Sequence, residues 1–472
     1  MANMASRSYS VCVLCRRSGF VRMLMRGMST SAQPQPQIDF LKGVPHKRHP
    51  GVTNLKTLRL PEELQAAAQI IIQDSKERQL PERAQKLSQY LWSRKRAVED
   101  SALRKKAVSL EREYWNEAME KITGEFDEEA LDNKIRRKVL TELKKTTYHW
   151  TPMKYDEEVA VVYMAARLAG GYAAVRRALN EIKKRDPAFA PHSLLDFGSG
   201  LGTVVWAAHS HWAESLKEMI CVDSSGPMNI LAERLLRGDD EKAQPHIKHV
   251  YFRHFLPVSP KVQFDLVVSA FTLSELQSVK DREEAVFTLW RKTSSYLVLI
   301  ENGTMEGHQI LMEARDSLLT KQEKMVHDPR PASVFAPCPH ERTCPKLTGH
   351  RVLPCNFVQL YQPVSLPRFP NNSPQREKFS YLILTRSGSQ QEETEGLDWA
   401  RLVAPVLRRS RHVHCHTCGS DGELKHLVVT TSKYTKDIYR CARNSEWGDQ
   451  LPLLQTEEED EEEGVQNQSD SE

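Results

Sequence analysis

Helical and strand periodicities alternate through the middle of the chain. Apolar residues recur at helical spacing in YDEEVAVVYMAARLAGGYAAVRRAL, residues 155–179, and the apolar run LLDF follows from Leu194. Segments long enough for helices then separate four more apolar runs, at residues 218–223, 249–255, 264–271 and 296–302. Strands that alternate with helices at this spacing predict an α/β protein with a doubly wound sheet, which we assign to residues 151–325.

The region before this domain, residues 40–150, is predicted to be helical and is heavily charged. Pro61 begins one predicted helix, because proline at the first helical position loses no needed hydrogen bond. Basic residues form three clusters, at Arg94 to Arg96, at Arg104 to Lys106, and at Lys134 with Arg136, Arg137 and Lys138. Such clusters suit the phosphate backbone of a nucleic acid, although interleaved acids are equally typical of a solvated helix surface.

Length and charge narrow the class of protein. A chain of 472 residues is expected to hold two or three domains. It has no uninterrupted apolar run of the length, about eighteen residues, that a membrane span needs. The formal net charge is +4, but nine of the 62 acids lie in residues 457–472. The rest of the chain therefore has 53 acids against 66 basic residues. A basic body with an acidic disordered tail, residues 451–472, indicates a polyanionic partner or simply a solvated surface.

The first 38 residues contain neither Asp nor Glu. Among Ser, Met and Val they carry five arginines, at Arg7, Arg16, Arg17, Arg22 and Arg26. This composition is typical of a mitochondrial transit peptide, and the apolar stretch YSVCVLC is too short for the core of a secretory signal. We therefore expect residues 1–30 to be a transit peptide and the protein to act in the mitochondrial matrix.

An acid and three glycines follow the first strand of the predicted sheet. The stretch LLDFGSGLGT places Asp196 before Gly198, Gly200 and Gly202, and Asp223 closes the next strand. Glycines let the backbone turn with positive φ and let a ligand approach closely. A dinucleotide site needs G-x-G-x-x-G, whereas the spacing here is G-x-G-x-G. The preceding acid favours a positively charged ligand over a pyrophosphate, and Asp223 suits a ribose hydroxyl. A purely structural turn is the other interpretation.

The stretch from Asp196 to Gly202 resembles the first motif of the class I S-adenosylmethionine methyltransferases. This resemblance implies S-adenosyl-L-methionine as a cofactor, with its methionine end over the glycines and its ribose at Asp223. The expected cofactor-binding residues are therefore Asp196, Gly198, Gly200, Gly202 and Asp223.

Catalytic residues are harder to find than cofactor-binding ones. Enzymes of this class handle their substrate after the fourth strand, and those that act on exocyclic amines carry an Asn/Asp-Pro-Pro-aromatic turn there. This chain has Ser269 to Thr272 at that place, and no cysteine nucleophile lies between Cys221 and Cys338. Ser274 and Glu275 are more typical of a helix cap. We assign no catalytic residue and predict a binding protein rather than an enzyme.

Six of the nine cysteines crowd into residues 338–441, at Cys338, Cys344, Cys355, Cys415, Cys418 and Cys441. Disulfides are rare in reducing compartments, so clustered thiols argue for a metal, while buried core cysteines are the other interpretation. A structural zinc site would typically show two Cys-x-x-Cys pairs, but only one pair exists, beside His412, His414 and His416. Irregularly spaced thiolates suit an iron–sulfur cluster at least as well as zinc.

The order of motifs along the chain closely resembles that of one family. After the presequence and the helical region come LLDFGSGLGT, LIENGT, CPHERTCP, HVHCHTC, IYRCAR and WGD. Over residues 40–450 the chain is similar to the mitochondrial methyltransferase-like assembly factors of the small ribosomal subunit, a family also found in bacteria and fungi.

This resemblance implies a matrix protein that binds the rRNA and proteins of the small ribosomal subunit, as a monomer and without a membrane. It also implies a 4Fe-4S cluster in a cysteine-rich module, residues 326–450, with Cys441 left as a core thiol. The ligands it implies are Cys338, Cys344, Cys355 and Cys418, with Cys415 in reserve. Two alternatives stay open: an active S-adenosylmethionine-dependent rRNA methyltransferase, and a zinc-dependent scaffold.

Overall fold

The computed structural model describes ten segments of the chain, which belong to one unit that begins at Phe40. They are residues 40–75, 79–122, 124–148, 150–238, 242–259, 261–321, 328–348, 352–366, 373–386 and 397–454. The predicted transit peptide and the acidic residues after Leu454 lie outside the described residues.

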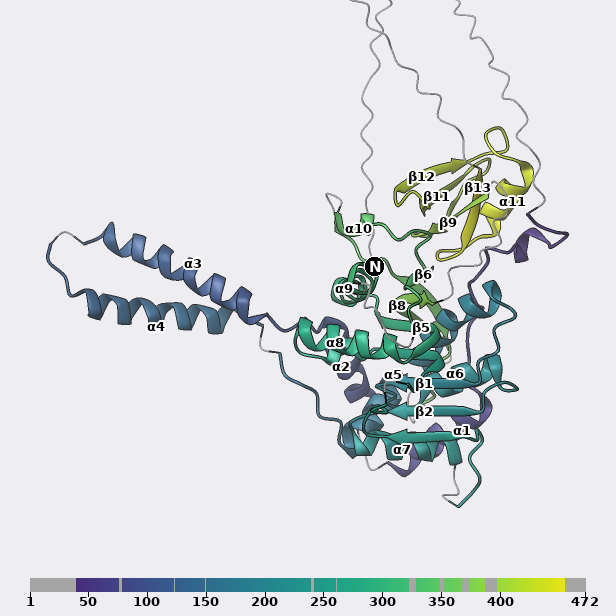
Figure 1. Ribbon diagram of the computed structural model, residues 1–472, viewed down its shortest axis with the longest axis horizontal. Helices are drawn as coiled ribbons and strands as arrows, with labels where there is room; N and C mark the ends of the chain where they lie inside the picture. The colour runs from purple at the N-terminus through teal and green to yellow at the C-terminus, as the bar shows by residue number, and fades with distance from the viewer. Residues whose placement is uncertain are drawn as a thin grey trace, which may run out of the picture. The chain divides into compact units, whose positions relative to one another are not determined.

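The main sheet has eight strands in the order β3-β2-β1-β4-β5-β8-β6, with β7 also paired to β8. Five strands are parallel: β1 (Ser193–Phe197), β2 (Glu218–Val222), β3 (Val250–Arg253), β4 (Phe264–Ala270) and β5 (Thr293–Asn302). The antiparallel strand β8 (Gln375–Thr385) pairs with β5 on one edge, and its other edge takes β6 (Ser333–Ala336) and β7 (Phe357–Tyr361). The predicted strands and the doubly wound arrangement are confirmed (Figure 1).

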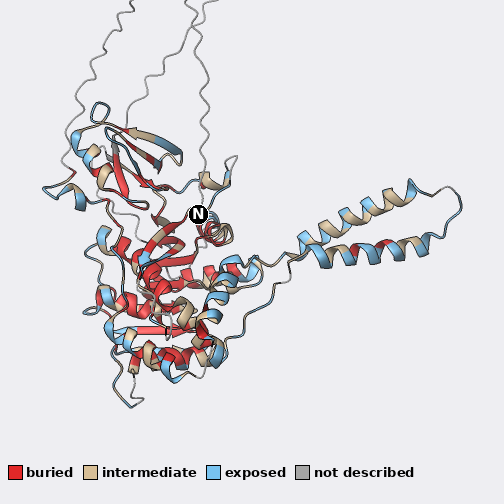
Figure 2. Cartoon of the chain, turned by 180° about the vertical axis from the view of Figure 1, so that it is seen from behind, coloured by how far each residue is buried: buried red, intermediate tan, exposed pale blue. Residues whose placement is uncertain are grey.

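Helices pack against both faces of this sheet. Leu194 and Leu195, neighbours in β1, belong to different apolar clusters because successive side chains of a strand point to opposite faces. The cluster with Leu194 includes residues of α1 (Glu62–Asp74), α2 (Leu80–Ser93), α5 (Glu157–Arg185), α6 (Thr203–Trp212) and α7 (Gly226–Arg237). The other cluster includes residues of α8 (Val279–Arg291) and α9 (Met305–Lys321). Figure 2 shows the buried residues gathered along the sheet and α5.

The predicted basic clusters after residue 100 lie on a helical hairpin. Helices α3 (Asp100–Met119) and α4 (Glu128–Thr146) pack on each other, and Ile135 and Val139 are the buried residues of α4 (Figure 1). Lys134 and Arg137 are exposed on the same helix. Arg136 and Lys138 pair with Asp132 and Glu117 at 3.0 and 3.3 Å, so acids of the hairpin neutralise part of this basic cluster.

A second, five-stranded sheet forms the C-terminal module. It contains β9 (Leu397–Leu402), β10 (Leu407–Arg408), β11 (Val413–Cys418), β12 (Leu424–Val429) and β13 (Gln450–Leu454). Helix α11 (Lys436–Asn444) covers its core, which includes Cys441 as predicted. Residues 451–454, assigned from the sequence to the acidic tail, belong instead to β13, which pairs with β9.

The segment from residue 40 to 54 packs on this C-terminal module, and residues 55–58 lie against β7 of the main sheet, although the sequence groups both with the N-terminal helices. Phe40 meets Trp399 of β9 edge to face, with ring centroids 6.2 Å apart. The backbone nitrogen of Thr53 donates to the Asp449 carboxylate at 2.8 Å. The two ends of the described chain are therefore held together by side-chain contacts.

A buried network of charges joins α5 to both sheets. Glu181 of α5 has no exposed surface and pairs with Arg177 at 3.0 Å and with Arg401 of β9 at 2.9 Å. The hydroxyl of Tyr381 in β8 donates to the same carboxylate at 2.9 Å. By length and composition α5 could cross a membrane, but most of its apolar stretch is buried in the core of this fold.

Candidate functional site

The glycine-rich loop lies between β1 and α6, as predicted. The backbone nitrogens of Gly198 and Ser199 donate to the carbonyl of Val222, at 2.8 and 3.1 Å, which ties the loop to the end of β2. Gly198 has a φ of 71°, and a Cβ there would lie 2.1 Å from the Thr272 hydroxyl oxygen. At Gly200, with a φ of 49°, a Cβ would approach nothing closer than 3.4 Å. Gly198 is therefore required by packing, whereas a Cβ at Gly200 would make only an ordinary van der Waals contact, with Met228.

This loop forms one wall of a cavity of about 380 Å³ at the carboxyl ends of the parallel strands. Asp196, Gly198 and Gly200 line it, together with residues of α5 and the end of β4. Gly202 is not part of the lining and serves as the N-cap of α6. Asp223 lies beside the loop and accepts from the Gly200 backbone nitrogen at 2.9 Å. The structure thus gathers the five predicted residues at one place, three of them on the cavity wall.

Asp196 carries the strongest electrostatic signal in this cavity. It is 1% exposed, and neither of its carboxylate oxygens has a hydrogen-bond partner in the described structure. Burial, together with the charge of Asp223, raises its pKa well above the usual range. The hydroxyls of Ser199 and Ser269 nearby are also buried without partners. A buried carboxyl without donors is stabilised by a cationic ligand, since an opposite charge restores its ionised form.

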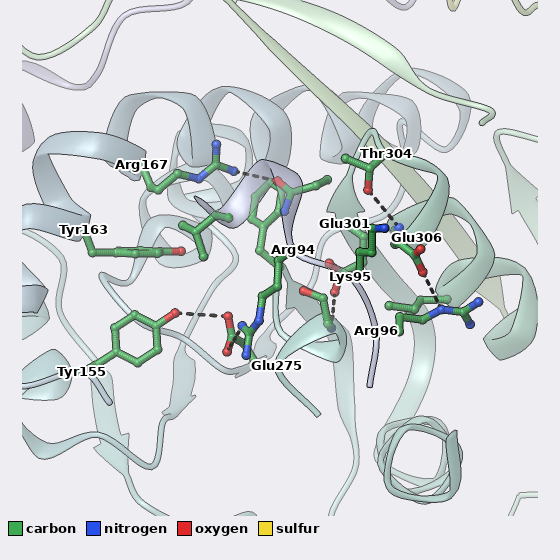
Figure 3. Close-up of a pocket in the computed structure, with 16 residues that line it drawn as sticks. Arg94, Lys95, Arg96, Tyr155, Tyr163, Arg167, Glu275, Glu301, Thr304 and Glu306 are labelled. Atoms are coloured by element: carbon green, nitrogen blue, oxygen red, sulfur yellow. Dashed lines mark hydrogen bonds and ion pairs between the residues drawn. The ribbon is translucent and has the colours of Figure 1, made fainter. Parts of the chain in front are cut away.

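A second cavity, of about 550 Å³, adjoins the first and shares Tyr163, Arg167 and Phe271 with it. Arg94, whose side chain is 5% exposed, pairs there with Glu275 at 2.6 Å and lies over the ring of Trp150 at 4.9 Å. Figure 3 shows Tyr155 directed at the same Glu275 carboxylate, at 3.3 Å. The charged side chains therefore bridge this cavity from one wall to the other.

This burial corrects one prediction from the sequence. Arg94 and Arg96 were expected on an exposed surface for phosphates, but Arg96 also pairs with acids of α9, including Glu306 at 2.7 Å. Within the described residues this basic cluster is mostly neutralised by carboxylates far away in the sequence. It is not a free phosphate-binding surface.

The second cavity also contains residues that sequence analysis missed. Glu301, at the end of β5, is 1% exposed, and burial raises its pKa to about 7. Phe271 has a left-handed φ of 59°, a conformation that is rare for aromatic residues and often marks a functional site. The guanidinium of Arg167 lies 4.8 Å from its ring centre. In the sequence, Glu301 stands out only as part of the motif LIENGT, which indicated the family but no role for this residue.

The four cysteines predicted as cluster ligands line one cavity of about 310 Å³. Cys338 follows β6, Cys344 precedes the short helix α10 (Pro345–Thr348), Cys355 precedes β7 and Cys418 ends β11. The connection from β6 to β7 of the main sheet supplies three of these cysteines, and it meets one strand of the C-terminal sheet at this cavity. Burial raises the pKa of the Cys355 thiol to about 12, so a free thiol there stays protonated.

Basic side chains surround these sulfurs. The Arg315 guanidinium lies 3.9 Å from the Cys338 sulfur. Nε2 of His308 lies 3.7 Å from the Cys344 sulfur, and Nε2 of His340 lies 3.4 Å from the Cys418 sulfur. Arg401 and Lys346 also line the cavity. Such surroundings stabilise negative charge on sulfur and supply the hydrogen-bond donors that thiolate-bound metal groups use.

Cys415 does not belong to this cavity. It faces the apolar core of the C-terminal module with Val413, whereas Cys418 lies an odd number of residues away and so faces the opposite side of β11. Across the described residues, no group of three or more His, Cys, Asp or Glu side chains is arranged to hold a metal ion. The geometry therefore places Cys418 at the cysteine cavity and Cys415 in the apolar core of the C-terminal module.

The main sheet has β1 at its centre and one antiparallel strand beside β5, and the glycine-rich loop follows β1. This arrangement defines a class I methyltransferase-like protein. The chain belongs to the family described as mitochondrial small ribosomal subunit Rsm22, whose model matches residues 157–452. The resemblance inferred from the sequence is confirmed.

Relatives and solved structures extend this comparison. The human ribosome assembly protein METTL17, mitochondrial, is 51% identical over 415 residues, which cover 88% of this chain and 87% of the human protein. The ribosome assembly protein RSM22 of Saccharomyces cerevisiae is 21% identical, and the matched region covers 63% of this chain and 67% of the Saccharomyces protein. The structure of magnesium protoporphyrin IX methyltransferase from Synechocystis is 11% identical, with a TM-score of 0.27, and covers 56% of this chain and 100% of its own.

Proposed function

We propose that this protein is an assembly factor of the mitochondrial small ribosomal subunit and acts in the matrix. The main support is the 51% identity to a human mitochondrial ribosome assembly protein over nearly the whole of both chains. In cells that lack the protein, sucrose gradients should show fewer complete small subunits and an accumulation of incomplete ones. An unchanged gradient profile would contradict the proposal.

We further propose that the first cavity binds S-adenosyl-L-methionine. Its residues fit this ligand, because the unpartnered Asp196 carboxyl suits the positive charge of the methionine end and the glycines leave room for close approach. When bound, the cofactor supplies an activated methyl group. Asp223 lies one hydrogen bond from the loop, where it would accept from the ribose hydroxyls.

Gly200→Val should weaken cofactor binding by at least about tenfold, which corresponds to about 1.4 kcal/mol. The added Cβ would meet the protein no closer than 3.4 Å, at Met228, so the side chain can occupy space that the ligand needs; the positive φ of 49° adds backbone strain. Calorimetry with S-adenosyl-L-methionine measures the effect. Gly202→Ala is the control, because that residue has a similar positive φ, 70°, but does not line the cavity. Equal affinity in Gly200→Val and wild type would defeat the assignment.

The adjoining cavity supports a binding role without methyl transfer. In an active enzyme of this class the methyl acceptor would have to approach the cofactor from this side, but here Arg94 and Glu275 bridge the space. Labelled S-adenosyl-L-methionine, purified protein and immature small subunits should therefore give no labelled rRNA. Labelled rRNA would favour the alternative, an active rRNA methyltransferase, with Glu301 as the candidate base because its pKa lies near 7. Glu301→Gln should then abolish the labelling.

A 4Fe-4S cluster is the group that we propose for the cysteine cavity, held by Cys338, Cys344, Cys355 and Cys418. A single zinc ion binds four sulfurs at about 2.3 Å and so draws them to within about 3.8 Å of one another. In a 4Fe-4S cluster each cysteine binds a different iron, so its sulfurs stand farther apart. The four cysteines line one cavity together with Arg401 and Lys346, and this shared lining supports a metal group there. The cluster would supply a covalent link between the two sheets.

The rRNA interface is proposed to include the basic residues after β10 and those of the α3–α4 hairpin. Arg408 is excluded, because its guanidinium donates to the carbonyls of Arg443 and Ser445, at 2.7 and 2.6 Å. It therefore holds the C-terminal module together. Arg409 and Arg411 are exposed and remain the candidate phosphate contacts in this segment.

Reversing Arg409 and Arg411 to glutamate should weaken binding to small-subunit rRNA. It should also reduce the slope of log affinity against log salt by about one for each phosphate that the protein no longer neutralises. Filter binding across a salt series measures both. A double reversal of Lys217 and Arg253, exposed residues of the main domain, controls for net charge. If the two double variants behave alike, the segment after β10 is not part of the interface.

A further inference from the structure

One face of the C-terminal sheet carries a cluster of histidine rings. His416 stacks on His426 with ring centroids 4.4 Å apart and planes 13° apart, and His414 and His426, with centroids 5.2 Å and planes 18° apart, share a hydrogen bond between Nδ1 and Nε2 at 3.0 Å. His412 adds an edge-to-face contact with His414 at 4.9 Å. His416 and His426 are exposed, and His414 is half-buried. Neither the cofactor cavity nor the cysteine cavity uses these four rings.

The strand register extends this face beyond the histidines. His414 pairs with Val428 of β12 and with Leu407 of β10, and directly opposed residues of paired strands lie on the same face. Leu407 is 50% exposed, so apolar surface lies beside the rings. Leu424, opposite Cys418 in the same register, is 45% exposed. Alternate residues of β11 point the other way into the module core, so this face is the solvent side of the sheet at the exposed His416 and His426, whereas its Cys418 end is covered at the cysteine cavity.

The rim of this face is basic. Arg409 follows β10, and its backbone nitrogen donates to the carbonyl of His412 at 2.9 Å, so the residue lies at one end of the histidine cluster. Arg411 is exposed in the turn that leads into β11. Of the two acids in the β11–β12 turn, Asp421 is paired with Lys425 at 2.5 Å, and Glu423 is exposed. Flat rings and apolar side chains with a cationic rim complement RNA, whose unstacked bases stack on aromatic rings while its phosphates meet basic side chains.

We propose that the exposed face of β10, β11 and β12 binds single-stranded RNA by stacking unpaired bases on His414, His416 and His426. This inference rests on the rRNA-binding function proposed above and names the surface and the kind of RNA that it takes. The same side of β11 carries Cys418, so the base-binding face and the cysteine cavity share one strand. Duplex RNA should bind this face poorly, because its bases are already stacked on one another.

The test compares three forms of the full chain with its metal group in place: wild type, His414→Ala with His426→Ala, and His192→Ala. His192 is exposed at the start of β1 and serves as the control. The probes are a fluorescein-labelled oligouridine of twelve nucleotides and a duplex RNA of the same length. Fluorescence anisotropy should show about tenfold weaker oligouridine binding in the double alanine variant alone, with duplex binding unchanged.

A second variant separates stacking from damage to the fold. His414→Phe with His426→Phe keeps flat rings at both positions and should keep most of the oligouridine affinity, with an unchanged absorption spectrum and melting temperature. Alanine variants that bind oligouridine like wild type, or phenylalanine variants that lose binding while folded, would overturn the inference. If wild type itself binds neither RNA, the proposed rRNA-binding function fails rather than this assignment of its surface.

Discussion

Cys418→Ser is expected to remove iron and colour from the anaerobically purified protein and to lower its melting temperature. Three of the four proposed ligands come from the connection between β6 and β7 of the main sheet, whereas Cys418 alone comes from the C-terminal sheet. Its loss would therefore break the link between the sheets as well as the cluster, because metal binding and local folding are coupled. Iron analysis, the visible absorption spectrum and thermal unfolding measure the three effects. Binding to small subunits should weaken in the same variant.

Cys415→Ser is the matched control, since it changes the same kind of side chain in the same strand. Cys415 faces the apolar core, so its variant should keep iron and lose only a modest part of the stability. A colourless wild-type protein with one zinc and no iron would reject the cluster. Retention of iron in Cys418→Ser together with its loss in Cys415→Ser would show that Cys415 is the fourth ligand.

Glu181→Ala is expected to destabilise the protein by about 3–5 kcal/mol, the usual cost of removing one partner from a buried ion pair. The substitution leaves Arg177 and Arg401, each 1% exposed, as buried cations without their carboxylate. Urea unfolding of the purified protein measures the loss. Glu233→Ala breaks an exposed pair with Arg237 of the same helical spacing and should cost less than about 1 kcal/mol. Equal losses in the two variants would show that the buried network contributes little.

The same carboxylate predicts a pH dependence. Burial alone would raise the pKa of Glu181, but the charges of Arg401 and Arg177 outweigh burial and hold this pKa well below its usual range. A carboxyl with a depressed pKa contributes stability above its unfolded pKa, about 4.3, and loses it as the pH falls toward the folded value. The difference in unfolding free energy between wild type and Glu181→Gln should therefore be constant near neutral pH and shrink below about pH 4. A difference that grows in acid would contradict this origin.

Local sequence patterns were sufficient to predict the strands and the cofactor loop. Alternating periodicities located β1 to β5, and the spacing of Asp196 and the three glycines located the loop, because both signals lie within a few residues of one another. The set of four cysteines came from a resemblance to a family. Strand alternation later gave the physical reason for choosing Cys418 over Cys415, but it could be used only once β11 was known to run from Val413 to Cys418.

Long-range contacts account for what the sequence did not reveal. Arg94 looked like part of an exposed basic cluster because its partner, Glu275, lies 181 residues later. Glu301 has a pKa near 7 only because other elements bury it. The grouping of residues 40–54 with the C-terminal module also depends on contacts, such as that of Thr53 with Asp449, that no local pattern encodes.

The contacts of residues 40–54 with the C-terminal module set an order of events if the chain enters a compartment with its N-terminus first. His49 bonds to Ser445 at 2.9 Å, and the Gly51 carbonyl accepts from the backbone nitrogen of Gln450 at 2.8 Å. These partners lie about 400 residues after the segment in the sequence. The N-terminal segment would therefore stay unpaired until nearly all of the remaining chain has been imported. During that interval chaperones and proteases compete for it. A chain truncated before β9 would lack these partners altogether. Its N-terminal segment would stay unpaired and would be the first part accessible to chaperones and proteases.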